Sequence, residues 1–329
     1  RTMKSDFSSD EIRAQVHRFW NAVSNKRASV EDLYFPSTTV FELEARRSET
    51  ARLLLARKLR DFAATETSFQ GTPGAIEVQM AGGFAIASYP CQYRSSTLDS
   101  DGSRVDYHSQ YCRMTQIFQK DDRNQLRIIH EHFSQSEPGK RTKIEAAAAR
   151  TASFTSTQLI SAMVDRSSVS LAALAPVDSA FAEQIRAEVA RFWRFYTGKS
   201  KDDMQSIYFP DAVVFPADGR RSEPARLCIA RRTREFFGPM SSVSAKPSTI
   251  DVQGNPEDAG IASYCFHFKM VRMYANGKRF AIDIPFTRLT QVFRKNESGA
   301  FNILHEHMSA AVLPTFTELP VSQPAMAAT

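Results

Sequence analysis

Two short segments of the chain combine residue types that could do chemistry, and they are nearly identical. The first reads His-Glu-His-Phe-Ser over residues 130–134, and the second reads His-Glu-His-Met-Ser over residues 305–309. Each lies in an apolar run that predicts a β-strand, in which successive side chains point to opposite faces. The two histidines and the serine of each segment therefore share one face, which predicts a lined cavity. The predicted lining is His130, His132 and Ser134 in the first segment and His305, His307 and Ser309 in the second.

A neighbouring predicted strand adds a cation to each cavity. Arg113 and Thr115 share one face of that strand, and Arg288 and Thr290 repeat them. A guanidinium held inside a β-sheet cavity is a fixed hydrogen-bonding fork for an anion. The alternative is an arginine on the sheet surface that pairs with the glutamate of the His-Glu-His segment. The sequence leaves both interpretations open.

A third predicted strand brings a tyrosine to each unit. The repeated sequence Ile-Ala-Ser-Tyr ends at Tyr89 in one copy and at Tyr264 in the other. A phenol that faces the cavity could hydrogen-bond a substrate or orient a water molecule. The alternative is a core aromatic residue whose hydroxyl group is satisfied within the protein.

The histidine pairs also raise the question of a metal. Two histidines two residues apart can bind one ion, but a stable site needs a third protein ligand. The remaining histidines, His17, His108 and His267, have no histidine counterpart in the other unit, and His108 aligns with Asp283. Serine-hydrolase, Walker and dinucleotide-binding glycine motifs are absent from the sequence. We therefore expect neither a metal nor a cofactor.

These segments belong to a duplicated unit. IRAQVHRFW at 12–20 recurs as IRAEVARFW at 185–193, and RRSE at 46–49 recurs at 220–223. The spacing between the copies stays nearly constant along the unit, which is far longer than the repeat of about 20–50 residues that is typical of a solenoid. Two complete globular domains are expected, and a chain of 329 residues is long enough for them.

Within each unit, helical patterns precede strand patterns. In the first unit a helix opens at Asp10, a second covers Glu49–Ala63, and four or five predicted strands follow. Helices grouped before a run of antiparallel strands predict an α+β fold. The predicted domains cover 6–136 and 179–312, with an Ala/Ser-rich, partly helical linker over 137–178 and an irregular tail over 313–329.

Composition narrows the class of partner. The net charge is +6, but the lysines and arginines are dispersed, so we expect no nucleic-acid partner. No apolar run is long enough to span a membrane. The four cysteines form no Cys-x-x-Cys pair, which argues against a zinc ribbon or a thioredoxin-type site. The chain begins at Arg1, which leaves open an organelle, after removal of a targeting segment, or the cytoplasm.

The element order and these motifs resemble the nuclear transport factor 2-like superfamily, a cone-shaped α+β fold that includes ketosteroid isomerases and polyketide-cyclase-like proteins. The stretch TRLTQVFRKNESGAFNILHEHMS, ending at Ser309, is similar to the end of the calcium/calmodulin-dependent kinase II association domain and of the metal-free iota-class carbonic anhydrases. The resemblance implies two tandem cones, each with N-terminal helices on a curved antiparallel sheet. Since such domains pair through their sheets, it also implies an internal pseudo-dimer.

The resemblance to iota-class enzymes implies metal-free hydration of CO2 in one or both cones. The catalytic groups would be Tyr89, His132 and Ser134 in the first unit and Tyr264, His307 and Ser309 in the second. The threonine of that family's pocket has no match, because Leu43 or Ala217 holds its place. The groups expected to bind a small molecule or an anion such as bicarbonate are Arg113, Thr115, His130, Arg288, Thr290 and His305.

Two other functions stay open. The first is a non-catalytic ligand-binding or assembly subunit, with a protein partner or an oligomer contact through the sheet faces. The second is a small-molecule isomerase or cyclase, for which only the fold argues.

Overall fold

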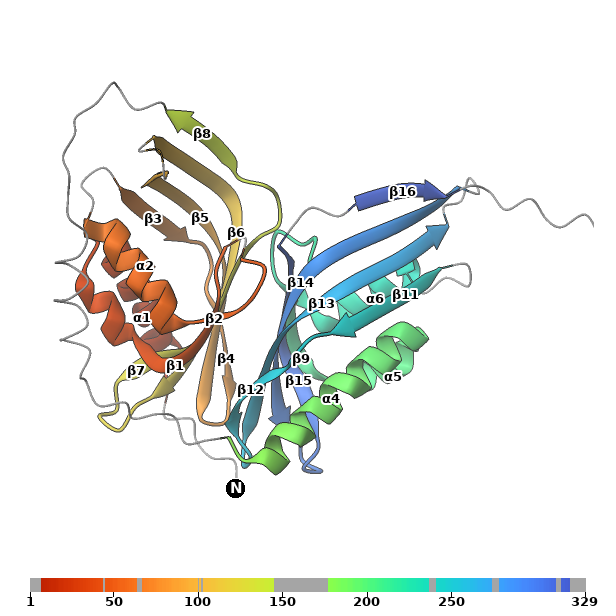
Figure 1. Cartoon of the computed structure of the whole chain (residues 1–329). Coiled ribbons are helices and arrows are strands. Elements are labelled where there is room, and N and C mark those ends of the chain that lie inside the picture. Colours follow the sequence, from red (N-terminus) through yellow and green to blue (C-terminus); the bar gives the residue numbers. More distant parts are fainter. Residues whose placement is uncertain are drawn as a thin grey trace, which may run out of the picture.

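The computed structural model describes residues 7–319 apart from 44, 64–66, 100, 102, 145–176, 237–240, 274–277 and 312–314. Two halves of the same architecture follow one another, each with helices on one side of a curved sheet (Figure 1). The elements of the first half are α1 Ser9–Ser24, η1 Ala28–Leu33, β1 Tyr34–Phe41, β2 Glu49–Thr50, α2 Ala51–Ala63, β3 Ser68–Pro73, β4 Glu77–Ala81, β5 Phe84–Leu98, β6 Arg104–Lys120, β7 Leu126–Gln135 and β8 Lys140–Ile144.

The second half repeats this order after the segment 145–176, which lies outside the described residues. Its elements are α4 Ser179–Gly198, α5 Lys201–Ser206, β9 Tyr208–Phe215, β10 Glu223–Pro224, α6 Ala225–Phe236, β11 Ser242–Pro247, β12 Asp251–Asn255, β13 Ala259–Met273, β14 Arg279–Lys295, β15 Phe301–Ala310 and β16 Thr315–Leu319. No described helix has the length and apolar character needed to cross a membrane.

The first helix of each half is fixed by its cap and by one apolar face. The Ser8 hydroxyl accepts a hydrogen bond from the backbone of Glu11 before α1, and the Asp178 carboxylate accepts one from Ala180 before α4. Both helices then bury a stripe at helical spacing against the sheet. The stripe is Ile12, Val16, Phe19 and Trp20 in α1 and Ile185, Val189, Phe192 and Trp193 in α4.

Each sheet is mixed, with one parallel pair. The strand order is β2-β1-β7-β6-β5-β3 in the first half and β10-β9-β15-β14-β13-β11 in the second. The pairs β1–β7 and β9–β15 run parallel, whereas the sequence predicted antiparallel sheets throughout. A parallel pair needs a long crossover, and α2 with the intervening meander, or α6 with its meander, supplies it. The rest of the predicted α+β cone is confirmed.

The two sheets pack against each other, which confirms the predicted internal pseudo-dimer (Figure 1). One apolar core lies beneath the helices of each half, and a third core joins the halves. Gln79 donates to the Leu304 carbonyl, and Gln253 donates to the Thr39 hydroxyl, so polar contacts also cross the junction. The shared core is made of Ala81, Phe84, Ile86, Ile117, Ile129, Ala259, Ile261, Val292 and Leu304.

Two predictions about the connecting segments need correction. The predicted linker 137–178 begins with a strand, β8, and the predicted irregular tail 313–329 contains another, β16. β7 pairs with the C-terminal part of β6, and β15 pairs with the C-terminal part of β14. The first residues of β6 and β14 therefore have no partner from β7 or β15. β8 and β16 cover these open edges, because unpaired strand groups favour pairing. Residues 145–176 of the linker, and 313–314 and 320–329 of the tail, lie outside the described residues.

Candidate functional site

The polar side chains predicted to line two separate cavities meet in one closed cluster between the halves. They occupy the outer faces of the sheets, away from the helices, and each is at most 1% exposed. We call this set the interface cluster. Its members are Arg113, Thr115, His130, His132 and Ser134 from the first half and Arg288, Thr290, His305, His307 and Ser309 from the second.

Each threonine of the cluster connects two histidines of the other half. Thr115 Oγ1 lies 3.0 Å from His305 Nε2 and 2.9 Å from His307 Nδ1. A hydroxyl group can donate one hydrogen bond and accept another, so a single threonine can bond one nitrogen of each ring. Thr290 mirrors this arrangement, 2.8 Å from His130 Nε2 and 3.0 Å from His132 Nδ1.

The serines complete the histidine contacts across the pseudo-two-fold axis. Ser309 Oγ lies 2.8 Å from His132 Nε2, and Ser134 Oγ lies 2.8 Å from His307 Nε2. The rings of His132 and His307 stack with centroids 3.8 Å apart and planes inclined by 7°. Both nitrogens of His132 and of His307 are therefore engaged within the protein.

The arginines bind backbone carbonyls of the opposite half. Arg113 Nη1 donates to the Pro216 carbonyl and to the Gly219 carbonyl, the latter at 2.8 Å. Arg288 Nη1 donates to the Glu42 carbonyl at 2.6 Å and to the Ala45 carbonyl at 3.1 Å. Each Nε also donates to the serine of its own half, at 3.2 Å and 3.0 Å. Both guanidinium groups therefore bind loop carbonyls of the opposite half. They form neither the anion-binding fork nor the pairing with glutamate that the sequence left open.

Burial sets the protonation of the cluster. Desolvation lowers the pKa of His130 and His305 from 6.5 to about 3, and the nearby His305 also lowers the pKa of His130. The pKa of His132 and His307 falls well below 6.5 through burial and the nearby cationic groups. Burial together with Arg288 lowers the pKa of Arg113 to about 9. Near neutral pH the four imidazoles are therefore uncharged beside two guanidinium groups.

The predicted tyrosines lie on the other face of each sheet and do not meet the histidines. Tyr89 is buried under α1, where its hydroxyl accepts from Trp20 Nε1 at 3.1 Å and donates to Gln116 at 2.9 Å. Tyr264 repeats these contacts with Trp193 at 3.0 Å and Gln291 at 3.1 Å. Both are core tyrosines with satisfied hydroxyls, which is the alternative that the sequence left open.

A buried carboxylate completes each inner network, and sequence reasoning assigned it no site role. Glu131 accepts from Tyr34 at 2.9 Å and from Gln116 at 3.0 Å, and burial raises its pKa. Glu306 accepts from Tyr208 at 2.6 Å and pairs with Arg232 at 3.1 Å. The signal was present in the sequence, because the glutamate between the two histidines recurs in both units and alternation sends it to the opposite face.

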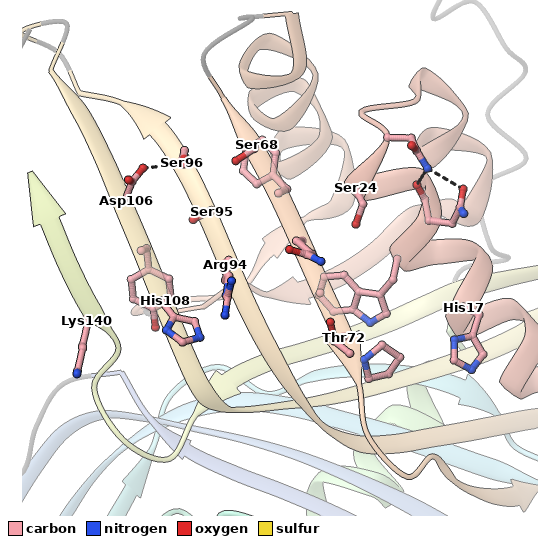
Figure 2. Close-up of a pocket in the computed structure, with 18 of the residues that line it drawn as sticks. His17, Ser24, Ser68, Thr72, Arg94, Ser95, Ser96, Asp106, His108 and Lys140 are labelled. Atoms are coloured by element: carbon pink, nitrogen blue, oxygen red, sulfur yellow. Dashed lines mark hydrogen bonds between the residues drawn. The ribbon is translucent and has the colours of Figure 1, made fainter. Parts of the chain in front are cut away.

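An open depression lies elsewhere on the first half, with a volume of about 1060 Å³. It is bordered by α1, β3, β5, β6 and β8, and Figure 2 shows His17 on the helix side and Lys140 on the strand side. Gly71 allows the Trp20 ring to lie against β3, since a Cβ at that position would fall 2.1 Å from the ring. The polar lining of the depression includes Asn21, Gln70, Thr72, Arg94, Ser96, Asp106, His108 and Thr142.

Metal ligands do not cluster among the described residues. No group of three or more His, Cys, Asp or Glu side chains in that part of the chain could hold an ion. The histidines of the interface cluster bond to threonine and serine hydroxyl groups.

No protein-family model and no curated protein matches the chain. Among solved structures it is similar to a ketosteroid isomerase-like protein from Erwinia carotovora atroseptica, with 14% identity over 41% of this chain and 99% of that one, at a TM-score of 0.34. A hexachlorocyclohexane dehydrochlorinase from Novosphingobium barchaimii shares 10% identity over 43% of this chain and 90% of its own, at a TM-score of 0.33.

A third similar structure is an NTF2-like protein from Cytophaga hutchinsonii, with 12% identity over 39% of this chain and 97% of that one, at a TM-score of 0.31. At these identities the likeness concerns the fold and does not extend to activity. The two halves share one strand order, as expected of the predicted tandem α+β domains.

Proposed function

We propose that the chain is a non-catalytic ligand-binding protein. The interface cluster joins the two halves, and the depression of the first half receives the ligand. The observation that carries this proposal is the burial of every predicted catalytic and anion-binding side chain. A group that no substrate or solvent can reach takes no part in turnover.

Hydration of CO2 is disfavoured by the state of the histidines. A general base needs a free nitrogen within reach of a water molecule and a route for the proton to solvent. Both nitrogens of His132 are bonded to hydroxyl groups, at 3.0 Å and 2.8 Å, and His307 is held in the same way. Tyr89 and Tyr264, which would complete the catalytic set, lie across the sheet in the helix-covered cores.

An isomerase or cyclase reading has less support than ligand binding. The titles of two similar structures name a ketosteroid isomerase-like protein and a dehydrochlorinase, but those likenesses extend to the fold alone. A cone-type enzyme needs an acid or base that a substrate can reach. Glu131 is the inner carboxylate of the first half, and it is 3% exposed with Tyr34 and Gln116 bonded to it.

The first prediction concerns the histidines on the pseudo-two-fold axis. Replacement of His132 by Ala should lower the free energy of unfolding by about 2–4 kcal/mol, because it removes two buried hydrogen bonds and opens a cavity. His307→Ala should cost a similar amount, and chemical denaturation measures both. The control is His17→Ala, since His17 is exposed and should change stability by less than about 0.5 kcal/mol. Equal stability of all three variants would contradict a structural role.

The second prediction concerns activity. Stopped-flow measurement of CO2 hydration should give the rate of buffer alone, with or without a chelator. The His132→Ala/His307→Ala variant should give the same rate. Its rate is measured without denaturant, after circular dichroism has shown a native fold. Catalysis by the wild type that resists the chelator and disappears in this folded variant would instead restore the hydratase reading.

The third prediction concerns pH. The four histidines have folded pKa values below their unfolded value of 6.5, so the unfolded state binds more protons once the pH falls under 6.5. Stability should therefore fall with the pH from 6.5 toward 3, by up to about 1.4 kcal/mol per pH unit for each histidine. His130→Gln with His305→Gln should make this slope shallower, and exposed His17→Gln should not. Identical slopes for all proteins would rule out the linkage.

The fourth prediction concerns the depression. The chain has two tryptophans, of which Trp20 lines the depression and Trp193 lies in the core of the second half. Protein labelled with 5-fluorotryptophan should therefore give two fluorine resonances. A ligand from a metabolite screen should shift the Trp20 resonance and leave Trp193 in place. A ligand set that shifts Trp193 alone would move the binding site to the second half and refute the proposal.

A further inference from the structure

We propose that the depression of the first half binds a small organic anion through Arg94 and Lys140. The inference rests on the proposed ligand-binding function and names the chemical class of the ligand, a carboxylate or a phosphate. Its basis is a row of side chains that crosses four strands on one face of the sheet. The row, called here the cationic row, is Gln70 of β3, Arg94 of β5, His108 of β6 and Lys140 of β8.

Strand register places these side chains next to one another. Gln70 pairs with Arg94, Arg94 pairs with His108, and His108 pairs with Lys140. Directly opposed residues of antiparallel strands share a face, with Cβ atoms about 4.5–5.5 Å apart. Figure 2 shows Arg94, His108 and Lys140 side by side on their three strands. Arg94 and Lys140 are exposed, so an incoming ligand can reach both charges.

Among the described residues, no acid pairs with Arg94 or Lys140. Arg94 and Lys140 form no ion pair with any described residue, and His108 Nε2 has no hydrogen-bond partner there. Asp106 is the one acid among the described lining residues. It is already held by Arg104 at 2.6 Å and by the Ser96 hydroxyl at 2.6 Å. Arg94 and Lys140 lie on the two strands that flank His108 of β6, so an anion placed over His108 would meet both charges.

The second half provides an internal comparison at the same positions. The equivalent row is Ser244, Lys269, Asp283 and Thr315. Asp283 replaces His108, and its carboxylate lies 3.6 Å from Lys269 and 2.5 Å from His267. Thr315 stands where Lys140 would be. This row is neutralised from within, so the two described rows differ: the cations of the first are unpaired, and the cation of the second has a carboxylate beside it.

The row also lies where a ligand has room. Along β5, Arg94 is on the same face as Ser88, which pairs with Thr115 of the interface cluster. Beyond that contact the strands β5 and β6 diverge from β13 and β14 (Figure 1). The outer sheet face is therefore covered near the cluster and open at the row. Exposed hydroxyl and amide groups of Gln70, Thr72 and Thr142 surround the cations and could orient the rest of the ligand.

Calorimetric titration of the full chain with inorganic phosphate and with succinate, at low ionic strength, tests the proposal. At least one of the two anions should bind, and uncharged glycerol should not. His108→Asp copies the residue of the second half, so it should fold normally while weakening anion binding about tenfold or more. Arg94→Gln should have a similar effect. The matched control is Lys269→Gln, which should leave binding within about twofold of the wild type.

The outcomes separate the anion inference from the proposed function. Binding of phosphate alone or of succinate alone identifies the source of the anionic group. Affinity that is equal in His108→Asp, Arg94→Gln and the wild type would overturn the anion site. The absence of binding by both anions would also overturn the anion site. If a neutral ligand then shifts the Trp20 resonance, the proposed ligand-binding function stands and only the proposed class of ligand is wrong. Circular dichroism of each variant confirms that a loss is not unfolding.

Discussion

A reciprocal exchange of two arginines is the constraint on which the rest of this structure depends. Arg113 of the first half binds carbonyls at Pro216 and Gly219 of the second, and Arg288 returns the contact to Glu42 and Ala45. A buried guanidinium without acceptors is strongly unfavourable, so each half requires the loop of the other. Between the arginines, threonine and serine hydroxyl groups bond to imidazole nitrogens of the opposite half. The sheet faces expected to bind an outside partner are thus covered by each other.

This pairing explains how a duplicated chain can be symmetric in one region and asymmetric in another. Every residue type in the interface cluster occurs in both halves, because each copy must fit the same contacts on its partner. The far ends of strands β5 and β6 diverge from those of β13 and β14 (Figure 1). There the halves differ in charge, with Arg94 and His108 in one and Lys269 and Asp283 in the other. The difference gives the two halves different surfaces on the same scaffold.

The helix-covered cores show a milder version of the same divergence. A hydrogen-bonded series of Trp, Tyr, Gln and Glu side chains is present in both cores, but the glutamate carboxylate has different neighbours in each. Glu306 pairs with Arg232, whereas the equivalent cation of the first half, Lys58, pairs with Glu42 at 3.1 Å. Glu131 keeps two neutral hydrogen-bond donors instead, and burial raises its pKa. The polar network therefore stabilises both cores, with an ion pair to the glutamate in one of them.

The duplication, the α+β order of elements and the polar residues that share a face within one strand could all be predicted from the sequence. These follow from local periodicity, so His130, His132 and Ser134 were placed correctly on one strand face. What covers that face depends on long-range packing, and the folded chain is needed to see that the same face of the other half covers it. Strand register between distant segments likewise created the cationic row, whose members Arg94, His108 and Lys140 carry no recognisable motif. Alternation along a strand is local, whereas contact between sheets and pairing between strands depend on the whole chain.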